Sequence, residues 1–165
     1  IRLVFGLTGA STIPNPLCFI VDFIVVFAIW SLYFTEVLPA GVPAMPARLR
    51  IWLACQFVLL FGAIASAAGF AALTLIPFGS ASGESAHWTP LPLFYVMLGL
   101  LGLRLAGLGA RDGLVITVIA VLATAVLTVL ALWVTPGAAL MLTLIAAAIV
   151  ASAATIAVIR NQRAG

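Results

Sequence analysis

The chain has 165 residues, of which 65% are hydrophobic and only 7% charged, with a net charge of +3 and a mean hydropathy of +1.35. Soluble domains carry roughly a quarter charged residues, so this composition excludes a water-soluble globular protein. The positive charge is too small and too scattered for a nucleic-acid-binding protein. The chain is therefore predicted to be an integral membrane protein whose surface faces lipid.

Five apolar stretches are long enough to cross the hydrocarbon core of a bilayer, which requires about 20 residues. In chain order they span residues 17–38, 51–76, 91–109, 114–134 and 138–159. Proline and glycine separate them, for example at residues 39–43 and 135–137, because these residues end helices. The sequence predicts an all-α bundle of about five transmembrane helices in one domain, residues 17–159.

The two ends of the chain are predicted to lie outside the membrane-spanning bundle. Residues 1–16 are too short and too rich in turn signals to span, which favours an interfacial or extended segment. Residues 160–165 are predicted to form a short tail. Because the numbering begins at isoleucine, we expect a processed chain or one that begins partway into the gene product, and no signal-peptide pattern is present.

Basic residues give the predicted orientation. All seven are arginines, and six fall on one side of a five-helix arrangement: Arg48, Arg50, Arg104, Arg111, Arg160 and Arg163. The positive-inside rule makes this side cytoplasmic, with the N-terminus outside, and only Arg2 disagrees. Interfacial aromatic residues fit this frame, with Trp88, Tyr95 and Trp133 at the outer interface and Tyr33 and Trp52 at the inner one.

The absence of lysine, together with abundant Ala, Leu, Val and Gly, is typical of a GC-rich bacterial genome. The predicted location is therefore the bacterial cytoplasmic (inner) membrane, which the chain crosses several times. Membrane lipids and other integral membrane subunits are the predicted partners, with a hetero-complex favoured over a homo-oligomer, and no nucleic acid is expected.

Asp22 lies five positions into the first predicted helix, about 8 Å below the outer boundary. A carboxylate at that depth is costly, which suggests proton or ion handling. The plainer alternative is a hydrogen-bonded aspartate that joins the first helix to a neighbour, and Tyr95, at a similar depth on the third helix, is its first candidate partner. This structural role is the favoured interpretation, because a lone acid makes a poor proton relay.

Arg104 interrupts an otherwise apolar third helix in its inner half. It lies too far along the membrane normal from Asp22 to pair with it, so Glu36 at the inner end of the first helix is the better candidate partner. An anionic lipid headgroup is the other option, and plain snorkelling of the side chain to the interface is favoured over a further function. Gln56 on the second helix is expected to join helices in the same leaflet.

Small residues recur along several predicted helices, and such stripes let helix backbones approach closely in lipid. The second helix contains Gly62-x-x-x-Ser66, and the third contains Gly102-x-x-x-Ala106. The longest stripe is on the fifth helix, at Ala139, Thr143, Ala147, Ala151 and Thr155. Trp30, which is deeper than the interfacial aromatics, is expected to pack inside the bundle.

The residues that carry chemistry are few. His87 is the single histidine, so haem held by a histidine pair and zinc held by two histidines are excluded. His87 is predicted to be a solvated loop residue rather than a proton relay or a ligand. Cys18 and Cys55 are expected near opposite membrane faces, which argues against a disulfide, and no metal-ligand or nucleophile motif is present.

Three classes of function remain. The favoured one is a non-catalytic, accessory or scaffolding subunit of a larger bacterial membrane complex, respiratory or photosynthetic, that acts through helix packing and bound lipid, quinone or carotenoid. The second is a small oligomeric transporter or channel that uses Asp22, although the chain lacks the paired broken helices typical of secondary transporters. The third and weakest is an intramembrane enzyme, since the sequence offers no nucleophile and base set.

Overall fold

The computed structural model describes residues 16–74, 87–107 and 114–164, and these form an antiparallel helical bundle without a strand in the described ranges. The elements are α2 (Pro16–Leu32), η1 (Tyr33–Val37), η2 (Leu38–Ala40), α3 (Pro46–Thr74), α5 (Pro90–Ala106), α6 (Leu114–Ala131) and α7 (Pro136–Ala164).

Among the described residues, four helical segments are long and apolar enough to cross a membrane, and they are Phe19–Val37, Pro46–Leu73, Leu114–Ala131 and Gly137–Gln162. The fifth, α5, is apolar but shorter. Large apolar side chains are exposed along the outer faces of the helices, as lipid-facing surfaces require. The prediction of an all-α, multi-pass membrane bundle of about five helices is confirmed.

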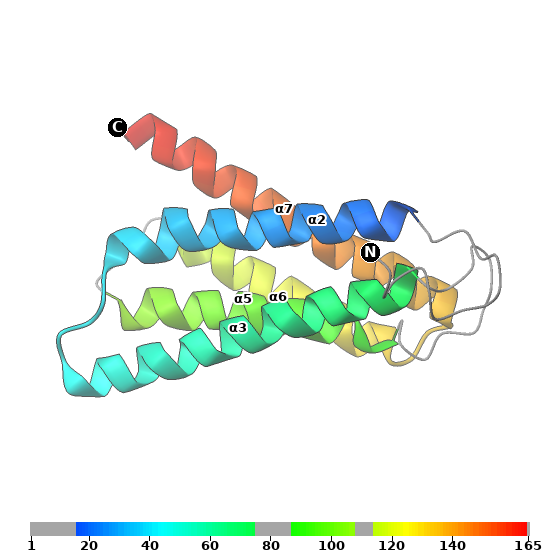
Figure 1. The fold of residues 1–165 in the computed structure, drawn as a ribbon, viewed down its shortest axis with the longest axis horizontal. Coiled ribbons are helices and arrows are strands. Elements are labelled where there is room, and N and C mark those ends of the chain that lie inside the picture. Colours follow the sequence, from blue (N-terminus) through cyan, green and yellow to red (C-terminus); the bar gives the residue numbers. More distant parts are fainter. Residues whose placement is uncertain (1–15, 75–86, 108–113, 165) are drawn as a thin grey trace, which may run out of the picture.

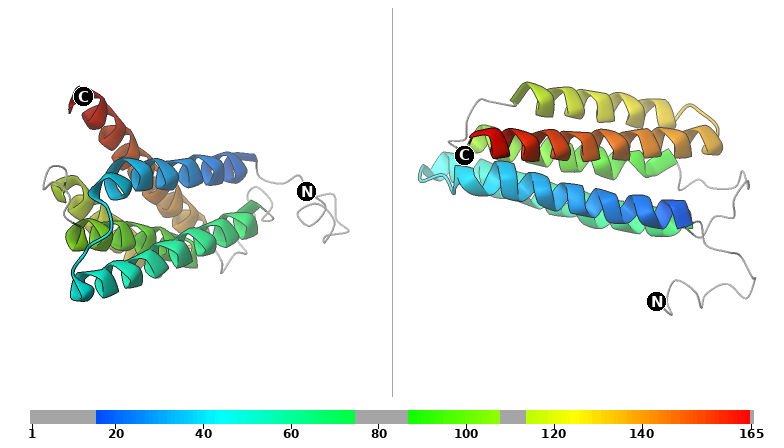
Figure 2. Two further views of the ribbon diagram at one scale, coloured as in Figure 1. Left: turned by 60° about the vertical axis from the view of Figure 1, so that its left-hand side comes forward. Right: turned by 90° about the horizontal axis from the view of Figure 1, so that it is seen from above.

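Figures 1 and 2 show the helices packed against one another along the bundle, and the contacts between them form a ring. Following the contacts between them, α2 packs on α3, α3 on α5, α5 on α6, α6 on α7, and α7 again on α2. Neighbours in the chain run antiparallel, so a ring of five must contain one parallel pair, and this pair is α2 and α7. We call the end where α2 leads into α3 the inner end, because the arginine pattern predicts it to be cytoplasmic.

The first membrane segment changes helix type before it ends. Tyr33–Val37 is a π-helical turn, in which the Leu38 amide donates to the Tyr33 carbonyl five residues back, and Leu38–Ala40 is a 3-10 turn. Pro39 accounts for this change, because its ring would clash with the carbonyl of Thr35 in a regular helix. Gly41 then ends the segment with a φ of 69°, a left-handed conformation that favours glycine.

The predicted helix bounds agree with the structure to within a few residues at most ends, and two differences matter. The second membrane helix begins at Pro46, five residues earlier than predicted, because proline is tolerated at a first helical position. The last helix continues to Ala164, so most of the predicted tail at 160–165 is helical. In Figures 1 and 2 these final turns of α7 leave the bundle at the inner end. Predictions for residues 1–15, 75–76 and 108–109 fall outside the described residues.

Candidate functional site

A buried ion-pair cluster occupies the inner end of the bundle. The Glu36 carboxylate, on η1, lies 2.9 Å from a guanidinium nitrogen of Arg104 on α5, and its other oxygen accepts a hydrogen bond from Arg160 on α7. Arg104 also donates to the Thr117 hydroxyl on α6 at 2.6 Å. We call Glu36, Arg104, Arg160 and Thr117 the Glu36 cluster. The structure shows Arg104 paired with its candidate partner Glu36, whereas the favoured interpretation, snorkelling of Arg104 to the interface, is wrong because its side chain is buried in the ion pair.

Burial makes this cluster energetically important. The side chains of Glu36 and Arg104 are each 8% exposed, whereas that of Arg160 is 34% exposed. Buried charges must be paired and hydrogen-bonded, because they have lost their hydration. One carboxylate here serves two guanidinium groups from two helices, so the cluster joins η1, α5, α6 and α7 at one point. π-helical turns like the one that carries Glu36 are frequent at functional sites.

Arg160 and Thr117 are the members that sequence reasoning missed. The predicted bounds place Arg160 in a tail, yet no proline or glycine interrupts the chain between Gly137 and Gly165. This absence of a stop signal could have extended the helix and placed Arg160 on its inward face. Thr117 carried no comparable signal, because threonine is common in membrane helices and pairs with their backbone.

Asp22 is half-buried on α2, and its Oδ1 has no hydrogen-bond partner among the described residues. The predicted hydrogen bond to Tyr95 is not formed, and the ring of Tyr95 contacts Phe61 and Phe94. The reason is the order of the ring, in which α2 neighbours α3 and α7 while Tyr95 lies on α5. An equal depth in the membrane did not bring the two residues together.

Two further polar residues join elements of the bundle. Gln56 on α3 donates a hydrogen bond of 3.4 Å to the Tyr33 hydroxyl on η1, as expected for a residue that joins helices, while its Oε1 is buried without a partner in the described part of the chain. A ring nitrogen, Nδ1, of His87 lies 2.7 Å from the carbonyl oxygen of Ala131 at the end of α6. His87 is thus half-buried and interacts with a helix terminus, which corrects the prediction of a solvated loop histidine.

Glycine makes the interface of α3 and α5 close. A Cβ added to Gly99 would lie 2.8 Å from the Leu59 backbone nitrogen, and one added to Gly62 would lie 2.8 Å from that of Val96. At Gly102 it would collide with the Cys55 sulfur, which belongs to a free cysteine. The small-residue patterns predicted on these helices therefore do mark a close helix contact.

The small-residue stripe on α7 is correct only over its first half. Ala139, Thr143 and Ala147 are buried, but Ala151 is half-buried and Thr155 is exposed. A spacing of four residues advances about 40° around the axis at each step, since a turn has about 3.6 residues. After four steps the stripe has left the inward face, and the buried positions are instead Val150, Ala153, Ala154 and Ala157.

An exposed aromatic ridge follows α2 and η1. It consists of Phe19, Phe23, Phe27, Trp30 and Phe34, spaced three or four residues apart and at least half exposed. Trp30, at 56% exposure, stacks on Phe34 with ring centroids 5.4 Å apart. The prediction that Trp30 packs inside the bundle is wrong, because the inward face of α2 is formed by Val25, Ala28, Ile29 and Leu32.

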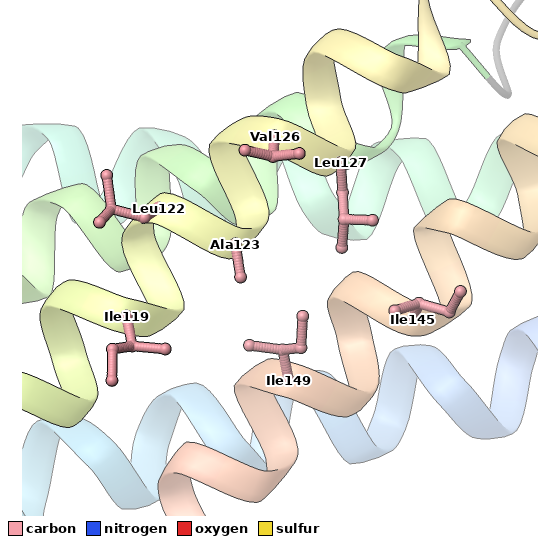
Figure 3. Close-up of a pocket in the computed structure, with 7 residues that line it drawn as sticks. All are labelled: Ile119, Leu122, Ala123, Val126, Leu127, Ile145 and Ile149. Carbon is pink, nitrogen blue, oxygen red and sulfur yellow. The ribbon is translucent and has the colours of Figure 1, made fainter.

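An apolar groove runs between α6 and α7 on the outside of the bundle (Figure 3). It has a volume of about 440 Å³ and is lined by Ile119, Leu122, Ala123, Val126, Leu127, Ile145 and Ile149. We call it the α6–α7 groove. Its size falls in the range of small-molecule pockets. Within the described residues, no group of three metal-ligating side chains is brought together.

Comparisons of the chain with protein-family models, with curated proteins and with solved structures found no match.

Proposed function

We propose that this chain is a non-catalytic subunit of a larger membrane assembly in the bacterial cytoplasmic membrane, with its C-terminus in the cytoplasm. The observation that carries the proposal is the aromatic ridge on α2 and η1. Aromatic side chains provide large contact areas and are enriched at the centres of protein interfaces. A continuous ridge of five such residues on one helix offers a partner helix a long surface to pack against.

The interactions of the polar side chains support the same proposal. Glu36 forms ion pairs with two arginines, Gln56 donates a hydrogen bond to Tyr33, and His87 contacts a helix end. Each of these interactions holds the bundle together rather than presenting a reactive group to a substrate. Flat or extended apolar molecules such as quinones or carotenoids are the ligands that we expect to share the aromatic surface with other subunits.

The test is co-purification from a native membrane in mild detergent. Phe23 and Phe27 are each 72% exposed on the ridge, and Phe57 on α3 is equally exposed and provides a matched control. We expect the double variant Phe23→Ala, Phe27→Ala to lose stoichiometric partner subunits, while Phe57→Ala retains them. Partners that survive the ridge variant, or a wild-type chain that purifies as a small homo-oligomer, would refute the proposal.

A second candidate function, an oligomeric proton-coupled transporter or channel, is favoured by one observation. Asp22 is half-buried, and one of its carboxylate oxygens is buried without a partner in the described chain, within a segment long and apolar enough to span a membrane. Intramembrane acids of this kind occur in proton relays. In liposomes that contain the purified chain and a pH-sensitive dye, this candidate predicts proton-coupled flux that Asp22→Asn abolishes. Absence of flux in the wild-type chain rejects it.

A further inference from the structure

We propose that the α6–α7 groove and Arg160 together bind one anionic phospholipid of the inner leaflet, with an acyl chain in the groove and the phosphate beside Arg160. This inference does not depend on the accessory role proposed above. It concerns the outer surface of the bundle between α6 and α7, whereas that role is carried by the aromatic ridge on α2.

The first step is that the groove leads to the Glu36 cluster. On α6, Ile116, Ile119, Ala123 and Leu127 follow one another at intervals of three and four residues, which places them on one helix face. On α7, Ile145, Ile149, Ile156 and Arg160 do the same at multiples of this spacing. On α6, Ile116 lines the cavity at the Glu36 cluster, whereas Ile119, Ala123 and Leu127 line the groove. On α7, Ile156 and Arg160 line that cavity, whereas Ile145 and Ile149 line the groove, so the two sites share one seam.

The second step is the charge at the inner end of this seam. Arg160 contacts Glu36 through one nitrogen, Nη2, and its guanidinium group has five N–H donors in all. Glu36 also serves Arg104, so its single negative charge is shared between two cations. Since Arg104 makes further interactions and is buried, the partly exposed Arg160 is the group that faces an incoming anion.

The third step is size. The cavity enclosed by the Glu36 cluster has a volume of only about 10 Å³, close to the minimum for one water. A phosphate group therefore does not enter it and must lie outside, against the exposed side of Arg160. An anion bound there lies between the Glu36 cluster and the lipid interface.

The fourth step is depth. Ile149 lies eleven residues before Arg160, or about 16 Å along the helix. This is close to half of the roughly 30 Å hydrocarbon core, which is the depth that the acyl chains of one leaflet fill. A phosphate at Arg160 thus places the chain of the same lipid against Ile149, which Figure 3 shows pointing towards the α6 side chains of the groove. Charge and length together favour a phospholipid over a purely apolar ligand.

The experiment uses the purified full chain in detergent and counts bound lipid by native mass spectrometry. Dioleoyl phosphatidylglycerol is the anionic probe, and dioleoyl phosphatidylcholine is the zwitterionic control. We expect the anionic lipid to bind about five-fold more tightly, in line with one arginine at a membrane surface. In Arg160→Gln this preference should disappear. Equal binding of the two lipids to the wild-type chain would overturn the proposal.

A second pair of variants tests the groove. Ala123→Phe places a large side chain in the groove, whereas Ala148→Phe adds the same bulk at an exposed position of α7 that does not line it. We expect Ala123→Phe to lower the affinity for both lipids at least five-fold and Ala148→Phe to leave it unchanged. Equal effects of the two variants, or a wild-type dimer that Ala123→Phe dissociates, would contradict a lipid in the groove.

Two controls keep the outcome decisive. If Arg160→Gln does not fold, the wild-type titration in 0.5 M salt replaces it, because screening should remove the preference for the anionic lipid. Inorganic phosphate and a short-chain phosphatidylglycerol are added as competitors. If both competitors displace the dioleoyl lipid only weakly, the result supports a site for the whole lipid. If inorganic phosphate by itself displaces the dioleoyl lipid, the proposal is refuted.

Discussion

Asp22 and Glu36 are two carboxylates on one membrane segment, fourteen positions or about 21 Å apart, and their surroundings differ completely. Glu36 meets two arginines from α5 and α7. Asp22 has an oxygen with no partner in the described chain. The carboxylate of Glu36 thus joins helices at the inner end of the bundle, whereas that of Asp22, in the outer half, keeps an oxygen without a hydrogen bond in the described chain.

The difference follows from what the neighbouring helices bring to each depth. Asp22 lies fourteen residues before Glu36, so at its depth the parallel α7 brings Ala146, fourteen residues before Arg160. Asp22 also lies eleven residues before Tyr33, so the antiparallel α3 brings Ala67, eleven residues after Gln56, the partner of Tyr33. Alanine side chains offer no hydrogen bond. A buried acid is therefore stabilising or costly according to its register with its neighbours and not according to its own helix.

The largest effect is expected from removing the occupied carboxylate. Glu36→Leu leaves the buried Arg104 and the partly exposed Arg160 without their shared anion. Breaking a buried ion pair on one side costs about 3–5 kcal/mol, so the free energy of unfolding in mixed micelles should fall by that amount. Glu36→Gln, which keeps a hydrogen-bond acceptor, should lose less. A loss below about 1 kcal/mol for Glu36→Leu would show that the cluster does not stabilise the bundle.

A packing defect away from both carboxylates provides a second loss of unfolding free energy, with which the loss in Glu36→Leu can be compared. Gly99→Ala introduces a Cβ 2.8 Å from the Leu59 backbone, and forced overpacking costs about 1–3 kcal/mol. Gly137→Ala is the control, because its new Cβ meets no atom within 4 Å. The same unfolding measurement should separate the two variants, and equal stability would mean that α3 and α5 can move apart without cost.

Removing the unsatisfied carboxylate should have the opposite sign. Asp22→Leu replaces a group that has a buried oxygen without a partner in the described chain, and such a group costs about 1–3 kcal/mol. The isolated chain should therefore gain about 1 kcal/mol of unfolding free energy, whereas Asp22→Asn should change it little. A clear loss of stability in Asp22→Leu would reveal a partner for Asp22 and end the contrast with Glu36.

The smallest effect is expected between the two carboxylates, at the contact of Tyr33 with Gln56. Tyr33→Phe removes a hydrogen bond of 3.4 Å, and such bonds between membrane helices contribute about 0.6 kcal/mol on average. Tyr95→Phe is the matched control, because the ring contacts of Tyr95 with Phe61 and Phe94 do not need its hydroxyl. If both variants unfold alike, the contact between η1 and α3 adds nothing measurable.

The sequence alone determined that the chain forms a membrane bundle, roughly where its helices lie, and that Arg104 shares its depth with Glu36. Hydropathy, helix breaks and depth are properties of single segments, and a single sequence contains them. Glycine patterns on α3 and α5 also indicated a close contact, because only small residues permit it.

Only the tertiary structure decided which side chains meet. It placed Arg160 beside Glu36, left Asp22 apart from Tyr95, turned Trp30 outward and moved Thr155 off the packed face of α7. The physical reason is that lipid is as apolar as the interior of the bundle. The hydrophobic pattern that marks the inward face of a helix in water is then weak, so the rotation of each helix and the order of the ring depend on packing and ion pairs between helices.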